Sequence, residues 1–273
     1  MPDPAAAPAS PPAVNPTFNR MGRVTGRAVL ITGASRGIGR ATALAFAQQG
    51  EHVAVHHRDS ADRAAAVLAE LPGDGHMVVQ GDLTDPAQAR RMVDEAAVGL
   101  GGLDVLVNNA GIYVTHPITE VSYEDWQAAW QQTLAVNLTG PANVTWSAVQ
   151  HMIPRGSGRI VNVSSRGAFR GEPGQPAYGA SKGGLNSFGQ SLAIALAPYG
   201  ITVSTVAPGF VDTEMAAERV NGPDGAEVRA QSPFGRIARP EEIASAVLYL
   251  ASPEAEWASG TIIDLNGASY LRP

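Results

Sequence analysis

The chain has 273 residues, a formal net charge of −6 at pH 7 and no cysteine. This length fits one large α/β domain or two small ones. The negative charge argues against nucleic acid or an anionic membrane surface as a partner. The lack of cysteine excludes disulfides and thiolate chemistry and fits a cytoplasmic location. No apolar run approaches the roughly 20 residues of a membrane span.

Residues 1–20 form a segment dominated by Pro, Ala and Ser. Such a composition buries too little apolar surface to fold, so we expect a disordered tail. The segment lacks the basic start and apolar core of a signal peptide. The expected folded domain therefore covers residues 21–273.

The stretch from Ala28 to Gly39 organises the rest of the chain. Four apolar residues predict a buried strand over 28–31, and an apolar helical pattern follows over 37–49. Three glycines between them, Gly33, Gly37 and Gly39, are spaced G-x-x-x-G-x-G. Glycines allow a pyrophosphate to approach the backbone, and the helix N-terminus favours its negative charge. The pattern predicts a phosphate cradle, against the alternative of a turn that serves packing only.

The end of the second predicted strand, residues 52–56, bears on the choice of cofactor. In such folds the residue there meets the adenosine ribose, where a carboxylate selects NAD. Arg58 stands here, 19 residues after Gly39, and its guanidinium suits the 2′-phosphate of NADP. Arg36 in the glycine loop offers a second cation. Asp59 is the next residue, and a shift of one residue would place its carboxylate near the ribose, so NAD remains an alternative cofactor. The other alternative is that Arg58 is a solvated loop charge without a role in binding.

Strands and helices alternate along the rest of the chain. Further helices are expected over 61–71, from Asp85 to about 101, and over 122–152, 178–197 and 240–251; further strands over 77–80, 103–107, 159–163, 201–206 and 260–265. This alternation predicts a Rossmann-type, doubly wound α/β domain with seven parallel strands and helices on both faces. Residues 213–239 show little periodicity and are predicted to be a mobile lid over the substrate.

Small and polar residues follow several predicted strands, at the edge where parallel sheets bind ligands. Asp82 follows the third strand and either binds the adenine edge or forms a turn. Asn108-Asn-Ala-Gly111 follows the fourth strand, where Asn108 could brace the sheet. Pro208-Gly209 follows the sixth, and Thr213 comes shortly after it.

Two side chains on the predicted helix 178–197 share one face, because Tyr178 and Lys182 are four residues apart. Ser165 lies 13 residues before Tyr178, at the end of a strand. Asn137 lies beside an apolar stripe of the predicted helix 122–152. Its side chain is interpreted either as a core amide with its hydrogen bonds satisfied or as an amide in the active site. His56 and His57 are interpreted as strand-end residues, and no metal site is predicted.

These residues occur in the order that is characteristic of one enzyme family. The quoted motifs are Thr32–Gly39, Asn108–Gly111, Asn137, Ser165, Tyr178-x-x-x-Lys182 and Pro208-Gly209. With them the chain resembles the short-chain dehydrogenase/reductase family over roughly residues 23–268, and is most similar to 3-oxoacyl-carrier-protein reductases and related alcohol or sugar dehydrogenases. The resemblance implies a homotetramer, with a dimer as the alternative. One departure is Asp264-Leu-Asn-Gly-Ala268, where members often carry Val-Asp-Gly-Gly.

The resemblance also implies roles for the site residues. Tyr178 would be the acid/base, with Lys182 favouring its phenolate, Ser165 binding the substrate oxygen and Asn137 completing a proton path through water. The implied cofactor contacts are Gly33, Ser35, Arg36, Gly37, Ile38, Gly39, Arg58, Asp82, Leu83, Asn109, Ala110, Gly111, Tyr178, Lys182, Pro208, Gly209, Val211 and Thr213.

The expected function is NADP(H)-dependent hydride transfer between the nicotinamide and a carbonyl or secondary alcohol. The alternatives are an NAD(H)-dependent sugar or alcohol dehydrogenase, a non-catalytic NADP(H)-binding regulator, and an isomerase or dehydratase on the same fold. Apolar residues near the expected mouth suggest a partly hydrophobic small-molecule substrate: Tyr113, Phe169, Phe210, Met215 and Phe234. Arg166 and Arg170 are predicted to be solvent-facing charges, with contact to an anionic group or a carrier protein as the alternative.

Overall fold

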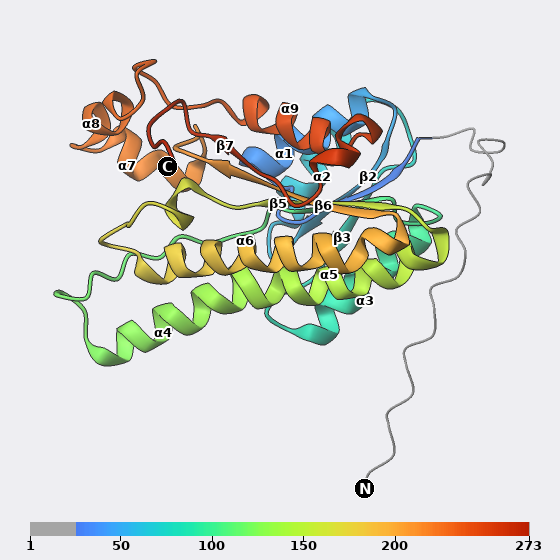
Figure 1. Ribbon diagram of the computed structural model, residues 1–273, viewed down its shortest axis with the longest axis horizontal. Coiled ribbons are helices and arrows are strands. Elements are labelled where there is room, and N and C mark those ends of the chain that lie inside the picture. Colours follow the sequence, from blue (N-terminus) through green and yellow to red (C-terminus); the bar gives the residue numbers. More distant parts are fainter. Residues whose placement is uncertain (1–25, 273) are drawn as a thin grey trace, which may run out of the picture.

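A single parallel sheet organises the fold (Figure 1). The computed structural model describes residues 26–272, so the expected tail over 1–20 lies outside the described residues. The seven strands are β1 (Ala28–Ile31), β2 (His52–His57), β3 (Met77–Gln80), β4 (Val105–Asn108), β5 (Gly158–Val163), β6 (Ile201–Pro208) and β7 (Ile262–Leu265). Their order is β3-β2-β1-β4-β5-β6-β7, and every pairing is parallel. The predicted doubly wound fold is confirmed.

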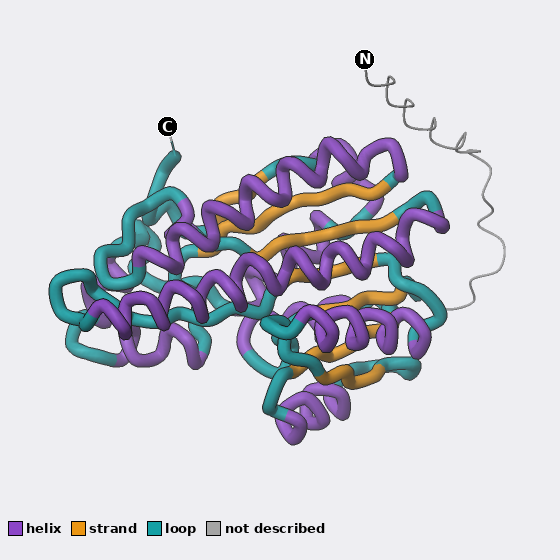
Figure 2. The backbone as a smooth tube through the Cα atoms, turned by 90° about the horizontal axis from the view of Figure 1, so that it is seen from below, coloured by secondary structure: helices purple, strands orange, loops and turns teal. Residues whose placement is uncertain are grey.

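Helices cover both faces of the sheet (Figure 1). One face carries α1 (Gly37–Gln48), α2 (Ala61–Glu70) and α9 (Pro240–Leu250). The other carries α3 (Pro86–Gly99), α4 (Tyr123–Leu134), α5 (Gly140–Met152) and α6 (Pro176–Leu196), which lie along the strands in Figure 2. No helix among residues 26–272 is long and apolar enough to cross a membrane.

Each sheet face builds its own hydrophobic core, because successive strand residues point to opposite sides. In β1, Val29 and Ile31 join the core under α1 and α9, which includes Phe46. Leu30 between them joins the core under α3 and α5, which includes Met152. All five side chains are fully buried. The two cores hold the carboxyl ends of the strands in register, and the site is built there.

Two expected elements differ in detail. The predicted helix over 122–152 is interrupted by a π-helical turn at Ala135–Thr139, just before Gly140 and Pro141. The expected lid over 213–239 contains two short helices, α7 (Glu214–Asn221) and α8 (Gly225–Ala230). Neither is long enough to show a clear apolar period, which explains why the sequence pattern missed them. The mobility of this segment stays a prediction.

Candidate active site

The glycine loop lies at the carboxyl end of β1, between β2 and β4, where the strand order reverses. Gly33 and Gly37 have φ of +63° and +55°, a region that side chains disfavour. A Cβ on Gly33 would lie 2.9 Å from the Cα of Ala110. The loop therefore leaves bare backbone at the start of α1, which fits the pyrophosphate of a dinucleotide.

A buried histidine braces this loop. The amide of Gly33 donates to Nδ1 of His56 at 3.0 Å, and Nε2 of His56 lies 2.9 Å from the carbonyl oxygen of Gly81. This pattern requires the neutral ring with its proton on Nε2. His56 thus ties the glycine loop to the end of β3, which confirms that it is a strand-end residue.

The pH dependence of stability should report this brace. Burial lowers the pKa of His56 from 6.5 to about 4. The unfolded chain takes up this proton near pH 6.5, so the free energy of unfolding should fall by up to about 3 kcal/mol as the pH drops toward 4. In His56→Gln, urea unfolding at pH about 7 and about 4.5 should lack this part of the fall. Parallel pH curves for the two proteins would rule out the proposed linkage.

Two asparagines lie at the carboxyl end of β4, Asn108 as its last residue and Asn109 directly after it. The side chain of Asn108 donates to Thr145 at 2.9 Å and to Asn162 at 3.0 Å, so it braces the sheet as predicted. The side chain of Asn109 donates to the carbonyl oxygens of Thr32 and Gly33 at 2.8 and 3.1 Å. Asn109 therefore holds the glycine loop in place as well as lining the cavity beside it.

Ser165, Tyr178 and Lys182 converge on this cavity. Ser165 follows β5, and its side chain forms a hydrogen bond with Tyr178. Nζ of Lys182 donates to the carbonyl oxygen of Val163 at 2.8 Å and lies 5.8 Å from the centre of the Tyr178 ring. The i, i+4 spacing on α6 thus brings phenol and ammonium to the end of β5.

The charges of this group are shaped mainly by burial. Desolvation raises the pKa of Tyr178 to about 12, although the bond from Ser165 opposes it. Desolvation lowers the pKa of Lys182 to about 8. The expected lowering of the phenol pKa by Lys182 is therefore outweighed by burial in this structure. At neutral pH the phenol is therefore protonated and the lysine is charged.

Asn137 lies in the π-helical turn and is fully buried. Its Oδ1 accepts from the amide of Ile112 at 2.8 Å, and its Nδ2 donates to the carbonyl oxygen of Ile112 at 3.0 Å. A Cβ on Gly111 would lie 3.3 Å from this Oδ1 and 3.5 Å from Nζ of Lys182. The π turn, a feature frequent at functional sites, thus brings the amide next to the lysine. Its part in a proton path stays a prediction.

Arg36 in the glycine loop and Arg58 after β2 also line the cavity, whereas Arg63 does not. Arg36 and Arg63 contact the carboxylate of Glu214 on α7 at 2.7 and 2.8 Å. Nε of Arg58 lies 2.5 Å from Oδ2 of its neighbour Asp59. Sequence reasoning missed Arg63 and Glu214, because only the packing of α7 brings residues 63 and 214 together.

One cavity of about 360 Å³ contains nearly all predicted site residues. Those that line it are Gly33, Ser35, Arg36, Gly37, Ile38, Arg58, Asp82, Leu83, Asn109, Ala110, Gly111, Ser165, Tyr178, Lys182, Pro208, Gly209, Val211 and Thr213. Gly39 and Asn137 do not line it. Gly39 packs behind the loop, where a Cβ would lie 2.4 Å from the carbonyl oxygen of Gly33. Asp82 also forms the alternative turn, accepting from the amide and hydroxyl of Thr84 at 2.9 and 2.8 Å.

The prediction for the mouth of the substrate cavity is partly wrong. Tyr113, Phe210 and Met215 line the cavity, but Phe169 and Phe234 do not. The prediction that Arg166 faces solvent is wrong, because this residue is only 3% exposed and lines the cavity. Arg170 is half-buried and bonds Gln231. Sequence reasoning also missed Glu172 and Arg219 in the lining; neither belongs to a recognisable motif.

A nucleotide cradle, a tyrosine–lysine–serine group and a shared cavity define an NAD(P)-dependent oxidoreductase of the Rossmann type. The sequence model of the family described as short chain dehydrogenase matches residues 27–224. The chain belongs to the short-chain dehydrogenase/reductase family, and it is an enzyme that acts on CH–OH or carbonyl groups. Among described residues, no group of three or more His, Cys, Asp or Glu side chains is placed to hold a metal.

Two curated relatives and one solved structure show the range of the similarity. The chain is 39% identical to 3-oxoacyl-[acyl-carrier-protein] reductase of Thermotoga maritima, over 91% of this chain and 100% of that protein. It is 39% identical to cis-4-hydroxycyclohexanecarboxylate dehydrogenase of Sinomonas cyclohexanicum, over 88% and 95%. A short chain dehydrogenase from Burkholderia cenocepacia in complex with NADP matches with a TM-score of 0.82 and 34% identity, over 91% of this chain and 99% of that one.

Proposed function

We propose that the protein is an NADP(H)-dependent carbonyl reductase or alcohol dehydrogenase in which Tyr178 is the acid/base. The observation that carries the proposal is the joint lining of one cavity by the glycine loop, Arg58, Ser165, Tyr178 and Lys182. The loop fits the pyrophosphate, and the hydroxyls of Ser165 and Tyr178 lie together where a substrate oxygen can meet both. The Burkholderia relative supports the choice of NADP by its bound cofactor.

The reduction follows from the positions of these groups. Ser165 donates a hydrogen bond to the carbonyl oxygen and stabilises the negative charge that develops there. Tyr178 passes its proton to that oxygen as the C=O double bond becomes single. The reduced nicotinamide, when bound, supplies the hydride to the carbonyl carbon and is left as NADP⁺. The charged Lys182 stabilises the phenolate, which then regains a proton from solvent.

The arginines at the adenosine end support the preference for NADP. The carboxylate of Glu214 between Arg36 and Arg63 demonstrates that an anionic group fits against these guanidinium groups. Arg58 lines the same cavity, and among residues 26–272 its side chain pairs with Asp59 alone, through an exposed ion pair. A 2′-phosphate would offer these arginines a stronger, bidentate partner.

The cofactor preference should be measured first. Fluorescence titration should give a dissociation constant for NADPH about 10- to 100-fold below that for NADH, and Arg58→Ala should remove most of this preference. Arg40→Ala is the matched control, because Arg40 pairs with Glu70 on the surface, away from the cavity. Tighter binding of NADH by the wild type would contradict the proposed preference for NADP and would favour Asp59 as the residue that meets the ribose.

We further propose a homotetramer in the cytoplasm. Trp146 on α5 is 58% exposed and Ile194 on α6 is 81% exposed. The family resemblance implies that the long helical segments over 126–152 and 176–197, which contain these residues, form the interfaces of the tetramer. Large exposed apolar side chains on neighbouring helices are typical of contact surfaces.

A further inference from the structure

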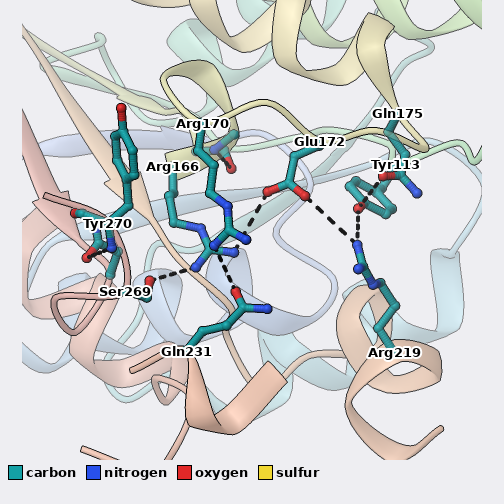
Figure 3. Close-up of polar contacts among 12 residues, drawn as sticks. Tyr113, Arg166, Arg170, Glu172, Gln175, Arg219, Gln231, Ser269 and Tyr270 are labelled. Atoms are coloured by element: carbon teal, nitrogen blue, oxygen red, sulfur yellow. Dashed lines mark hydrogen bonds and ion pairs between the residues drawn. The ribbon is translucent and has the colours of Figure 1, made fainter. Parts of the chain in front are cut away.

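A group of charged side chains lies beside Tyr113 (Figure 3). The ring of Tyr113 contacts that of Tyr178, the proposed acid/base. The group consists of Arg166, Arg170 and Glu172, from the segment between β5 and α6, and Arg219 from α7, and we call it the arginine cluster. Arg166, Glu172 and Arg219 line the same cavity as Tyr178, whereas Arg170 does not. The four described side chains bring three positive charges and one negative charge together, so the cluster has an excess of positive charge.

Arg166 is the most confined member. Its side chain is 4% exposed, and its sole hydrogen-bond acceptor among the described residues is the hydroxyl of Ser269, at 2.7 Å. The nearest carboxylate oxygen, on Glu172, is 3.8 Å away, beyond hydrogen-bond distance. A buried guanidinium with five N–H donors and one neutral partner is poorly compensated. The guanidinium of Arg166 therefore favours the binding of a further anion.

Arg219 approaches the same point from the lid. Its guanidinium lies 5.6 Å from the centre of the Phe210 ring, and that of Arg166 lies 5.2 Å from the same ring. Glu172 lies between the two arginines, 4.0 Å from Arg219 (Figure 3). Its carboxylate is thus a loose counterion to both and bonds neither closely. A carboxylate on a ligand could form the close, bidentate contacts that Glu172 does not.

The cluster lies one aromatic ring away from the reacting group. The hydroxyl of Tyr113 accepts from Arg219 at 3.0 Å, and its ring meets the Tyr178 ring edge-on, with 4.9 Å between their centres. An anion held by Arg219 and a carbonyl oxygen held by Tyr178 are therefore separated by about the size of one ring. A compact substrate can reach both positions.

We propose that the substrate is a compact oxo acid, or the hydroxy acid in the reverse direction, whose carboxylate lies between the guanidinium groups of Arg166 and Arg219. This inference rests on the proposed function, because it places the carbonyl at Ser165 and Tyr178. The carboxylate is unchanged in the reaction; the carbonyl carbon gains the hydride and its oxygen the proton. The name of the Sinomonas relative, a hydroxycyclohexanecarboxylate dehydrogenase, accords with this class.

The test compares one ring ketone with and without the charge. We expect the kcat/KM for NADPH-dependent reduction of 4-oxocyclohexanecarboxylate to exceed that of its neutral carboxamide by about 10- to 100-fold. Arg219→Gln and Arg166→Gln should each remove most of this ratio, and Arg219 is half-exposed, so its variant should fold. Arg40→Gln is the matched control, because Arg40 pairs with Glu70 on the surface, away from the cavity, and should leave the ratio unchanged.

Glu172→Gln should change the KM for the acid substrate in the opposite direction to the arginine variants. If Glu172 occupies the place of the substrate carboxylate, its neutral variant should bind the acid more tightly and lower the KM for it, with little effect on the carboxamide. Weaker binding of the acid in Glu172→Gln would show that Glu172 holds the two arginines in position. It would overturn our assignment of Glu172 as a counterion that the substrate carboxylate displaces.

A binding measurement separates this inference from the proposed function. Cyclohexanecarboxylate, which cannot react, should bind the full-length protein with NADP⁺ in calorimetry, and cyclohexanecarboxamide should bind far more weakly. If cyclohexanecarboxylate binds in a way that depends on the arginines but no ketone is reduced, the proposed function is overturned and the proposed carboxylate site is supported. Equal turnover of acid and carboxamide, or faster reduction of the neutral N-acetylcysteamine thioester of a 3-oxo acid, would overturn the acid site and keep the reductase.

Discussion

Tyr178→Phe should lower kcat/KM for carbonyl reduction by about a thousandfold while the dissociation constant of NADPH changes little. The substitution removes only the phenolic oxygen, so the edge-on contact with Tyr113 is preserved. The proton that the carbonyl oxygen requires must then come from water. Stopped-flow measurement of NADPH oxidation at saturating cofactor gives the effect on the chemical step, and fluorescence titration gives the binding.

The control for this variant is Tyr249→Phe. Tyr249 lies on α9 and is 51% exposed, away from the cavity, so the loss of its hydroxyl should leave turnover unchanged. Turnover of Tyr178→Phe within a few fold of the wild type would exclude the phenol as the proton donor. Loss of NADPH binding in Tyr178→Phe would show instead that the hydroxyl serves the cofactor site.

Lys182→Met should lower kcat/KM by about a hundredfold or more and also weaken NADPH binding. Methionine keeps much of the apolar stem but removes the ammonium, which bonds Val163 and faces the cavity. Because the pKa of Lys182 is lowered to about 8, the wild-type kcat/KM should fall as the pH rises past that value, and this step should be absent in Lys182→Met. Steady-state profiles of both proteins over that range provide the measurement.

The composition of the chain makes this pKa directly measurable. Lys182 is the single lysine, and the other 18 of the 19 Lys and Arg residues are arginines. Protein labelled with ¹⁵N-lysine should therefore give one side-chain amine resonance, whose titration reports Lys182 alone. A midpoint near the ordinary lysine value of about 10.4 would show that the ammonium is not desolvated and would remove the expected pH step.

Several features of the site were predictable because they depend on local sequence. The glycine spacing, the helix after it and the four-residue step from Tyr178 to Lys182 all follow from backbone geometry over short segments. The strand ends at Asn108 and Ser165 follow from the alternation of elements, because the carboxyl ends of parallel strands share one edge. These predictions hold in the structure without knowledge of long-range contacts.

Other features depend on which distant segments pack together. Arg166 resembles a solvated loop charge in the sequence, yet Ser269, about 100 residues away, accepts its hydrogen bond, and the residue is buried. Glu214 joins Arg36 and Arg63 only because α7 lies over the start of α1. The π turn at Asn137 likewise appears within an uninterrupted helical pattern, and Asn137 is held there by Ile112.

The amino-acid sequence by itself determined the fold class, the glycine loop and the side chains that we propose to react, because short-range backbone preferences and the order of elements carry that information. Only the tertiary structure decided what surrounds those side chains. The burial that raises the pKa of Tyr178 and lowers that of Lys182, and the meeting of Arg166 with Arg219, arise from solvent exclusion between segments far apart in the chain. Desolvation and charge proximity are properties of packing, and packing is set by the whole fold.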